Sequence, residues 1–466
     1  MAPTVDKVAA RLLGQALRRV SYDENAIEDL LGEDAWETAL EDVPAHDRRL
    51  PQSPVGTVIR LFFLELPVSL DDAKQALGGS GVEALERTGL AEIGADASPR
   101  SRIVPVDKLL LASDRLSTSP ADDPPNYVST YTPTARLCDL LTPRPQAERT
   151  LDVGTGNGVH ALLAAAHSRR VVATDVNPRA LEFTELNAAL SGLQNVECRL
   201  GSLYEPVDGE HFDLITCNAP FVVSPERRWA YRDGSFDGDE LSERMVREAA
   251  AHLRDGGFAT LVVSWLAHDA STPDERAAGW VEGSGCDAWI LPIAEATPLE
   301  HAERWNAHLG GDPAAYGEAL DRWMSYLEEL DARVVTEGAV ILHRRPGANT
   351  TRIDEVDEDE LEAADAQIQR AFATRAQLDG ADTLDARLAP ADALRVETQV
   401  RQGRTIGARV VLEEGTWPVL EVSGRAAEVV AALDGRRTLR ELSAPPEAVV
   451  LCRELLELGA LELVDA

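Results

Sequence analysis

The stretch LDVGTGNGVHA, Leu151 to Ala161, decides the fold that this sequence predicts. Apolar residues run into Asp152, and three closely spaced glycines then allow a tight turn before a helical pattern begins. A strand, a glycine-rich turn and a helix form the first unit of nucleoside-binding α/β folds. The third glycine comes too early for the G-x-G-x-x-G spacing of dinucleotide sites. The turn therefore predicts a nucleoside site, with a plain tight turn as the alternative.

Apolar runs and helical patterns alternate on both sides of this turn. Six apolar runs lead to a hairpin-like pair, ARVVTEG and AVILHRR, at residues 332–345. Residues 177–192 and 239–257 have the period of amphipathic helices. This alternation predicts an α/β fold with a doubly wound, seven-stranded, mostly parallel sheet. In such folds ligands bind at the carboxyl ends of the strands.

The next two strand ends carry polar residues suited to a nucleoside. Asp175 ends the second strand, about twenty residues after the first glycine, where an acid can accept hydrogen bonds from both ribose hydroxyls. Asn177 follows as the expected N-cap of the next helix, a structural role. Ser202 and Leu203 end the third strand and could contact an adenine ring, although Leu203 could equally be core.

The stretch CNAPFVV, residues 217–223, follows the apolar run FDLIT. An amide at Asn218, a rigid Pro220 and an aromatic Phe221 are unusual where a buried strand ends. They indicate a site that needs an exposed amide, with a strand-ending turn as the alternative.

Together these motifs resemble the class I S-adenosylmethionine-dependent methyltransferases, from about Tyr127 to Arg345. Asn218 to Phe221 is similar to the N-P-P-[YF] motif of enzymes that methylate planar amide or amino nitrogens. The resemblance implies that the Asn218 side chain and the Ala219 carbonyl accept the two hydrogens of that nitrogen. It also implies that Pro220 stiffens the turn and that Phe221 stacks on the substrate. Ala219 departs from the family's proline, which removes the φ lock and keeps the carbonyl.

The resemblance implies S-adenosylmethionine as the cofactor. The residues expected to bind it are Asp152, Gly154, Thr155, Gly156, Gly158, Asp175, Ser202, Leu203 and Asn218. The segment NYVSTYTPTA, residues 126–135, stands where this family commonly covers the cofactor. Its members Tyr127, Tyr131, Thr132 and Pro133 are equally expected to contact the cofactor or to pack. The histidines show no metal-binding spacing, so no metal site is expected.

Two stretches favour glutamine as the methyl acceptor. Residues 184–207 and 231–265 resemble the corresponding segments of release-factor glutamine methyltransferases. A net charge of −35 disfavours nucleic acid and favours a protein substrate, such as a translation factor or a ribosomal protein. Phe221 and the following VVSP look more like the guanine amino methyltransferases, so a nucleobase or a small molecule stays open. Ala219 leaves open a sensor or scaffold that binds the cofactor without turnover.

Two breaks predict three domains. The segments at Ser117–Pro125 and Arg344–Thr351 are rich in loop-forming residues. They separate an N-terminal domain at 1–119, a methyltransferase domain at 126–345 and an acidic C-terminal domain at 352–466. Residues 82–93 and 452–463 each predict a helix, a glycine cap and a strand after another helical stretch, which is a winged-helix-like pattern. Their acidity favours recognition of protein over DNA.

The remaining features place the protein in the cytoplasm. Five scattered cysteines form no C-x-x-C pair, which favours a reducing compartment. The N-terminus lacks the pattern of a signal peptide, and the longest apolar stretch near it is too interrupted to span a membrane. Trp265, Trp280 and Trp289 are expected to pack in the core. An amphipathic helix at Asp312–Ala332 either shapes the substrate entrance or extends the helical layer.

Overall fold

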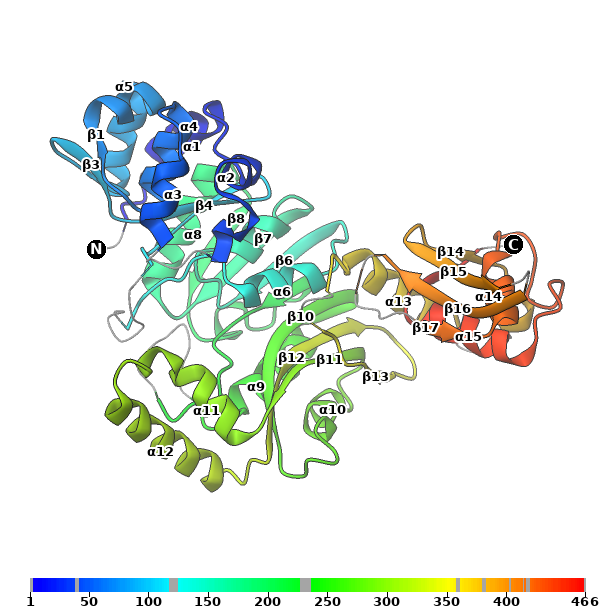
Figure 1. The fold of residues 1–466 in the computed structure, drawn as a ribbon. Coiled ribbons are helices and arrows are strands. Elements are labelled where there is room, and N and C mark those ends of the chain that lie inside the picture. Colours follow the sequence, from blue (N-terminus) through cyan, green and yellow to red (C-terminus); the bar gives the residue numbers. More distant parts are fainter. Residues whose placement is uncertain are drawn as a thin grey trace.

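The protein consists of a central sheet with one smaller part on each side (Figure 1). The computed structural model describes residues 3–37, 42–116, 125–226, 236–357, 361–378, 383–401, 404–413, 415 and 420–464. The predicted linker at Ser117–Pro125 lies outside the described residues apart from Pro125.

The central sheet has the order β13-β11-β12-β10-β9-β6-β7-β8. Its strands are β6 (Ala147–Val153), β7 (Ser168–Asp175), β8 (Val196–Leu200), β9 (Phe212–Cys217), β10 (Leu253–Ala267), β11 (Cys286–Ala296), β12 (Val334–Arg344) and β13 (Thr351–Ile353). Strands β6 to β10 are parallel, whereas β12 is antiparallel to both of its neighbours, β10 and β11. The strand order reverses between β6 and β9, which places a ligand site at their carboxyl ends.

Helices cover both faces of this sheet. They are α6 (Pro133–Leu141), α7 (Val159–Ala164), α8 (Pro178–Ser191), α9 (Glu240–His252), α10 (Glu275–Val281) and α11 (Pro298–Asn306), and α12 (Pro313–Glu329) packs against α11. Adjacent residues of β9, Leu214 and Ile215, belong to different buried clusters because successive strand side chains point to opposite faces. The predicted doubly wound α/β core is therefore confirmed. The predicted tryptophans Trp265, Trp280 and Trp289 are all buried in it.

The predicted hairpin at residues 332–345 is wrong, because β12 is one continuous strand. Gly338 lies within this strand and pairs with Val263 and Pro292. A Cβ at Gly338 would lie 2.3 Å from the Leu291 carbonyl oxygen and 2.8 Å from the Trp265 ring. The glycine therefore permits a close approach to a buried ring, and it does not form a turn.

The predicted count of seven strands is also wrong, since the sheet contains eight. The additional strand, β13, follows the predicted end of the domain at Arg345 and pairs in parallel with β11. Its three residues are too few to show the period of a strand in the sequence.

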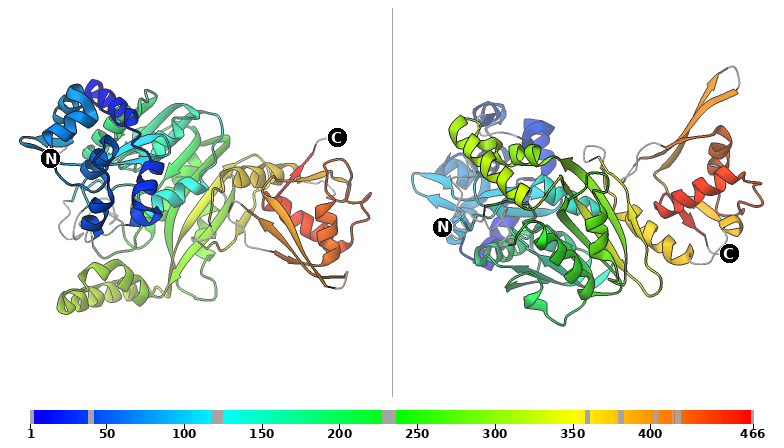
Figure 2. Two further views of the ribbon diagram at one scale, coloured as in Figure 1. Left: turned by 45° about the horizontal axis from the view of Figure 1, so that its top comes forward. Right: turned by 90° about the horizontal axis from the view of Figure 1, so that it is seen from below.

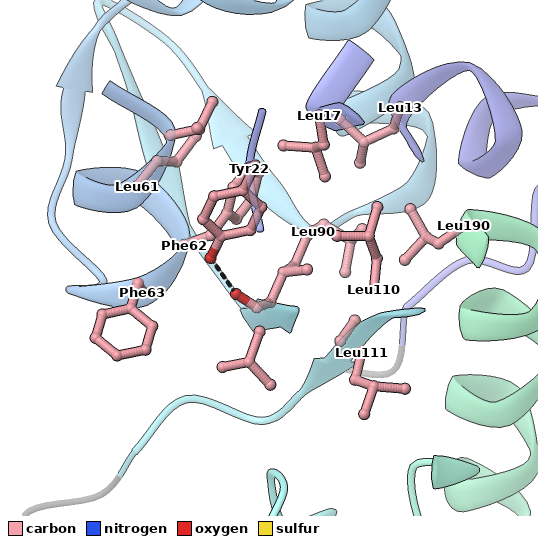
Figure 3. Packing of buried hydrophobic residues seen from close by; sticks show 14 of the residues in the cluster. Leu13, Leu17, Tyr22, Leu61, Phe62, Phe63, Leu90, Leu110, Leu111 and Leu190 are labelled. Carbon is pink, nitrogen blue, oxygen red and sulfur yellow. Dashed lines mark hydrogen bonds between the residues drawn. The ribbon is translucent and has the colours of Figure 1, made fainter. Parts of the chain in front are cut away.

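The N-terminal part shares its core with helix α8 of the central part. Its elements are α1 (Lys7–Arg19), α2 (Glu24–Leu31), α3 (Val43–Arg49), α4 (Pro54–Val58), β1 (Val68–Ser69), α5 (Leu70–Thr88), β2 (Ala91–Ile93), β3 (Asp96–Pro99), β4 (Arg102–Val106) and β5 (Leu109–Ser113). Figure 3 shows Leu190 of α8 packed among Leu13 and Leu110, and one buried cluster contains all three side chains. The close contact between these parts means that they do not have separate hydrophobic cores.

The C-terminal part is attached differently. It contains α13 (Asp365–Leu378), β14 (Leu388–Pro390), β15 (Leu394–Arg401), β16 (Arg404–Leu412), β17 (Leu420–Val422), α14 (Gly424–Ala431), α15 (Pro446–Glu457) and β18 (Leu461–Leu463). Helix α13 contributes Phe372 to the central core, where the ring lies 6.0 Å from that of Phe258. The strands and helices beyond α13 enclose a cluster of their own and project away from the sheet (Figures 1 and 2).

Candidate functional site

A cavity of about 220 Å³ lies at the carboxyl ends of the parallel strands. Its walls come from the segment before α6, from the turns after β6, β7, β8 and β9, and from the start of α9. The lining residues are Tyr127, Val128, Ser129, Val153, Gly154, Gly156, Asp175, Val176, Asn177, Ala180, Gly201, Ser202, Leu203, Asn218, Ala219, Pro220, Phe236 and Leu241. The cavity stands at the reversal of strand order, as expected for this fold.

The glycine-rich turn brings the first and fourth strand ends into contact. Gly154 has a φ of +69°, and a Cβ at this position would lie 2.9 Å from the Cβ of Ala219. A larger residue would therefore be strained and would displace the turn after β9. Gly156 has a φ of +58°, and a Cβ there would meet no atom within 4 Å, so this residue borders open space.

Asp152 lies beneath the turn and does not line the cavity. Its carboxylate accepts hydrogen bonds from the hydroxyls of Thr155 (2.6 Å) and Thr216 (2.8 Å) and from the amide of Ala161 (3.2 Å). Burial raises the pKa of Asp152 to about 6, although these hydrogen bonds oppose the rise. Asp152 and Thr155 thus fix the shape of the turn from inside.

Asp175 lines the cavity and also holds the turn. Its Oδ2 accepts a hydrogen bond from the amide of Gly156 (2.9 Å), and its Oδ1 accepts one from the amide of Asn177 (2.8 Å). Burial is the largest cause of a raised pKa at Asp175. Asn177 caps α8 by accepting from the amide of Arg179 (3.1 Å), which confirms its predicted structural role.

Apolar side chains line the part of the cavity next to Asp175. Val176 is 56% exposed although it is aliphatic, and Leu203, which has a φ of +47°, also lines the cavity. The Leu203 carbonyl accepts a hydrogen bond from the Thr174 hydroxyl (3.3 Å), which fixes this turn. The exposed Val176 offers a surface for a flat, apolar ligand group.

Asn218, Ala219 and Pro220, from the turn after β9, also line the cavity. The Asn218 side chain has no hydrogen-bond partner in the described part of the chain, although it is only half-exposed. Neighbouring polar side chains such as Asp152 and Asn177 do have partners. The amide of Asn218 is therefore available to a ligand.

Phe221 does not line the cavity. It is 9% exposed and belongs to the buried cluster that contains Leu137, Cys138 and Trp289. The structure thus places the predicted stacking ring in the core, because the chain turns back toward the sheet after Pro220. Among the described residues, Tyr127 and Phe236 are the aromatic side chains that line the cavity.

Helices α11 and α12 contact the segment that follows Phe221. The Nε2 of His301 donates a hydrogen bond to the Val223 carbonyl (2.9 Å), and Val222 packs against Trp323. Burial lowers the pKa of His301 to about 4. The Tyr326 hydroxyl accepts a hydrogen bond from the amide of Gly238 (2.7 Å), just before α9. The predicted amphipathic helix therefore supports two walls of the cavity.

Eight of the predicted site residues line one cavity: Gly154, Gly156, Asp175, Ser202, Leu203, Asn218, Ala219 and Pro220. The other predicted site residues do not line the cavity: Asp152, Thr155, Gly158 and Phe221. Of the four residues expected either to cover the cofactor or to pack, Tyr127 lines the cavity, Tyr131 packs on the N-terminal core, and Thr132 and Pro133 begin α6.

Sequence reasoning missed Val176, Phe236 and Leu241 as lining residues. Val176 could have been found from its place directly after Asp175 at a strand end. No local signal marks Phe236 or Leu241, since the fold of distant segments brings them to the cavity.

The described residues contain neither a candidate metal site nor a helix that could span a membrane. They contain no group of three or more histidine, cysteine or acidic side chains that could hold a metal ion. Within the same ranges, every helix is too short or too polar to cross a lipid bilayer.

Two parts of the chain match known families. Residues 132–269 match the family described as the methyltransferase small domain. Residues 19–102 match a domain of unknown function, DUF7059. The first match contains every predicted site residue, and the second lies within the N-terminal part.

Curated relatives of the central part are glutamine methyltransferases. The chain is 35% identical over 129 residues to a release factor glutamine methyltransferase of Xylella fastidiosa, covering 25% of this chain and 47% of that protein. It is 34% identical over 168 residues to one of Deinococcus radiodurans, covering 30% and 60%. A ribosomal protein uL3 glutamine methyltransferase of Bradyrhizobium diazoefficiens is 37% identical over 125 residues, covering 24% and 39%. The chain therefore spans about half the length of the curated relatives that it matches.

Solved structures add little to this. A methyltransferase from Pyrococcus furiosus superposes with a TM-score of 0.28 at 18% identity, over 46% of this chain and 83% of that one. The assignment of the fold follows from the strand order of the central sheet. Residues 132–269 are therefore similar to the methyltransferase small domain, and the predicted resemblance to class I methyltransferases, and among them to the protein glutamine methyltransferases, is confirmed.

Proposed function

We propose that this protein uses S-adenosylmethionine to methylate the side-chain amide of a glutamine in a translation factor or ribosomal protein. The observation that carries the proposal is the partner-free amide of Asn218 on the wall of the cavity. The names of the curated relatives support glutamine as the acceptor.

The cavity fits the proposed cofactor. S-adenosylmethionine supplies a methyl group carried by a positively charged sulfur. A carboxylate offers about four acceptor positions, and Asp175 uses two of them for backbone amides, which leaves capacity for ribose hydroxyls. The open space at Gly156 and the exposed side chain of Val176 suit the nucleoside.

Asn218 and Ala219 can orient a planar nitrogen. The nitrogen of an amide is a weak nucleophile because its lone pair is delocalised. The Asn218 side-chain oxygen can accept one of its hydrogens, and the Ala219 carbonyl can accept the other. Orientation and exclusion of water then provide most of the rate increase. No base is required beforehand, because the acidity of the nitrogen rises as the methyl group arrives.

The domain division at 1–119, 126–345 and 352–466 is part of this proposal, with the outer domains as winged-helix-like modules for a protein substrate. In the N-terminal part, α5 bends at Gly78, and β2 and β3 follow it and form a small sheet with β1, which precedes it. In the C-terminal part, β18 follows α15 and pairs with β14. These arrangements support the winged-helix-like assignment. The proposed substrates also imply a cytoplasmic location.

The test is methyl transfer by the full chain. The protein is incubated with methyl-labelled S-adenosylmethionine and a bacterial lysate, and the product is treated with protease or nuclease. We expect protease to release the label, and peptide mass spectrometry to find methylated glutamine. Asn218→Ala serves as the matched control and should transfer little label.

Three outcomes would contradict the proposal. Release of the label by nuclease would indicate a nucleobase acceptor. Label on small molecules alone would exclude a protein substrate. Cofactor binding without any transfer would indicate a sensor or scaffold.

A further inference from the structure

One wall of the cavity is a short stretch of chain, residues 126–129, which we call the cover segment. Tyr127, Val128 and Ser129 line the cavity. The backbone of the segment bonds to groups outside it at each end. The Ser129 carbonyl accepts a hydrogen bond from the Asn157 side chain in the glycine-rich turn (3.2 Å). The segment therefore depends on other elements for its position.

Asp114 binds the middle of the cover segment. This residue directly follows β5 of the N-terminal part. Its Oδ2 accepts a hydrogen bond from the Val128 amide (2.8 Å), and its own amide donates one to the Val128 carbonyl (3.0 Å). The two bonds join the N-terminal part to the cavity wall.

Arg179 completes the attachment from the other side. It stands in the first turn of α8 and donates to both carboxylate oxygens of Asp114. It also donates to the Asn126 carbonyl (3.2 Å). The Arg179 and Asp114 side chains are only 10% and 15% exposed, so water screens this pair little.

The same interface reaches the glycine-rich turn. The Asn187 side chain of α8 is fully buried and exchanges two hydrogen bonds with the backbone of Ala112 in β5 (2.8 and 2.9 Å). It also donates to the Asn157 carbonyl (2.8 Å). One amide therefore links the N-terminal part to the turn that borders the cavity.

We propose that Asp114 and Arg179 are positioning residues that fix the cover segment against the cavity, so that the N-terminal part sets the affinity for the cofactor. The proposal rests on the proposed function only in that S-adenosylmethionine binds in this cavity. Neither residue lines the cavity, so both act through residues 126–129. The N-terminal part thus has a role in cofactor binding in addition to any role in recognition.

The test measures S-adenosylmethionine binding to the full chain by calorimetry. We expect Asp114→Asn and Arg179→Gln each to raise the Kd about tenfold, because each removes a charged partner of the segment. The kcat at saturating cofactor should stay within about twofold, since the acceptor side is untouched. Hydrogen exchange at the Val128 amide should accelerate, and it is best measured in a further variant, Asp114→Ala, which removes the acceptor of that amide completely.

The matched control is Arg18→Met. Arg18 lies on α1 and donates to the Leu190 carbonyl of α8 (3.1 Å), so this change loosens the same interface away from the cavity. It should lower the Tm and leave the Kd unchanged. An unchanged Kd in Asp114→Asn and Arg179→Gln would overturn the inference, as would an equal rise in Arg18→Met. Absence of binding by the wild-type chain would overturn the proposed function as well.

Discussion

The polar side chains on the two sides of the cavity differ in whether they have hydrogen-bond partners within the protein. Behind the proposed cofactor side, the Asp152 carboxylate is buried and accepts three hydrogen bonds from its own surroundings. On the proposed acceptor side, the Asn218 amide lines the cavity without a partner among the described residues. Buried polar groups normally find partners within the fold. A partnered side chain therefore maintains the shape of the site, and the unpartnered one is left for a ligand.

The largest expected effect is that of Asn218→Ala, which removes the acceptor-side amide. Turnover should fall roughly 100- to 1000-fold, because one hydrogen-bonding group that orients the reacting nitrogen is lost. Cofactor affinity should change less than about twofold. Calorimetry and a methyl-transfer assay measure the two effects separately.

A matched control for this variant is Asn195→Ala. The Asn195 amide donates to the carbonyls of Ala165 and Ser168 (both 2.9 Å), away from the cavity. This variant should lose stability and keep its turnover. Normal turnover by Asn218→Ala would remove the basis for the acceptor-side assignment.

The second prediction concerns the pH dependence of stability. His301, which supports the acceptor side, is 1% exposed, and burial lowers its pKa from 6.5 to about 4. Between these values the unfolded chain binds a proton and the folded chain does not, so stability falls as the pH falls. The full loss is about 3 kcal/mol below pH ~4. In His301→Gln this loss should disappear, while the amide can still donate to Val223.

The measurement is chemical unfolding of both proteins at pH 7 and pH 4. Asp152 has the opposite effect, because its raised pKa of about 6 adds stability as the pH falls toward 4. Comparison of the variant with the wild type cancels this contribution. Glu337 lies 3.8 Å from the His301 Nδ1, and burial raises its pKa as well. Equal losses of stability in the two proteins would show that His301 does not titrate as described.

The third prediction tests the cofactor side through Asp175→Asn. The amide keeps one acceptor for the backbone and loses the charge that strengthens bonds to ribose hydroxyls. Affinity for S-adenosylmethionine should fall about 10- to 100-fold, corresponding to about 1.5–3 kcal/mol. The kcat at saturating cofactor should change little. A normal Kd together with a low kcat would reverse the roles of the two sides.

The smallest expected effect is that of Ala219→Pro, at the contact between the two sides. Proline keeps the carbonyl at this position and restricts φ. Turnover should stay within about tenfold of the wild-type value or rise. Ala219→Gly is the control, because it removes the methyl group that packs against Gly154 and should lower turnover. A proline variant less active than the glycine variant would show that the carbonyl needs the freedom that alanine provides.

Much of the central domain could be predicted because its signals are local. The turn around Gly156, the acid at Asp175 and the amide at Asn218 each follow a buried strand directly in the sequence. Parallel strands place such ends at one edge of a sheet, so proximity in space follows from the pattern. The prediction that Phe221 contacts the substrate came from the similarity of residues 218–221, taken together, to the N-P-P-[YF] motif. The direction of its ring depends on the buried cluster that it joins, whose other residues lie outside the motif.

The class of the fold and the edge of the sheet that carries the cavity follow from the sequence pattern alone. The continuity of β12 became visible only in the folded chain, since the distant Trp265 ring leaves no space for a side chain at Gly338. The tertiary structure also decided that the N-terminal part belongs to the cavity, through a pairing of Asp114 with Arg179 that spans 65 positions of the chain. The physical reason is that periodicity reports which face of an element is buried, whereas the partner on that face depends on how the whole chain packs.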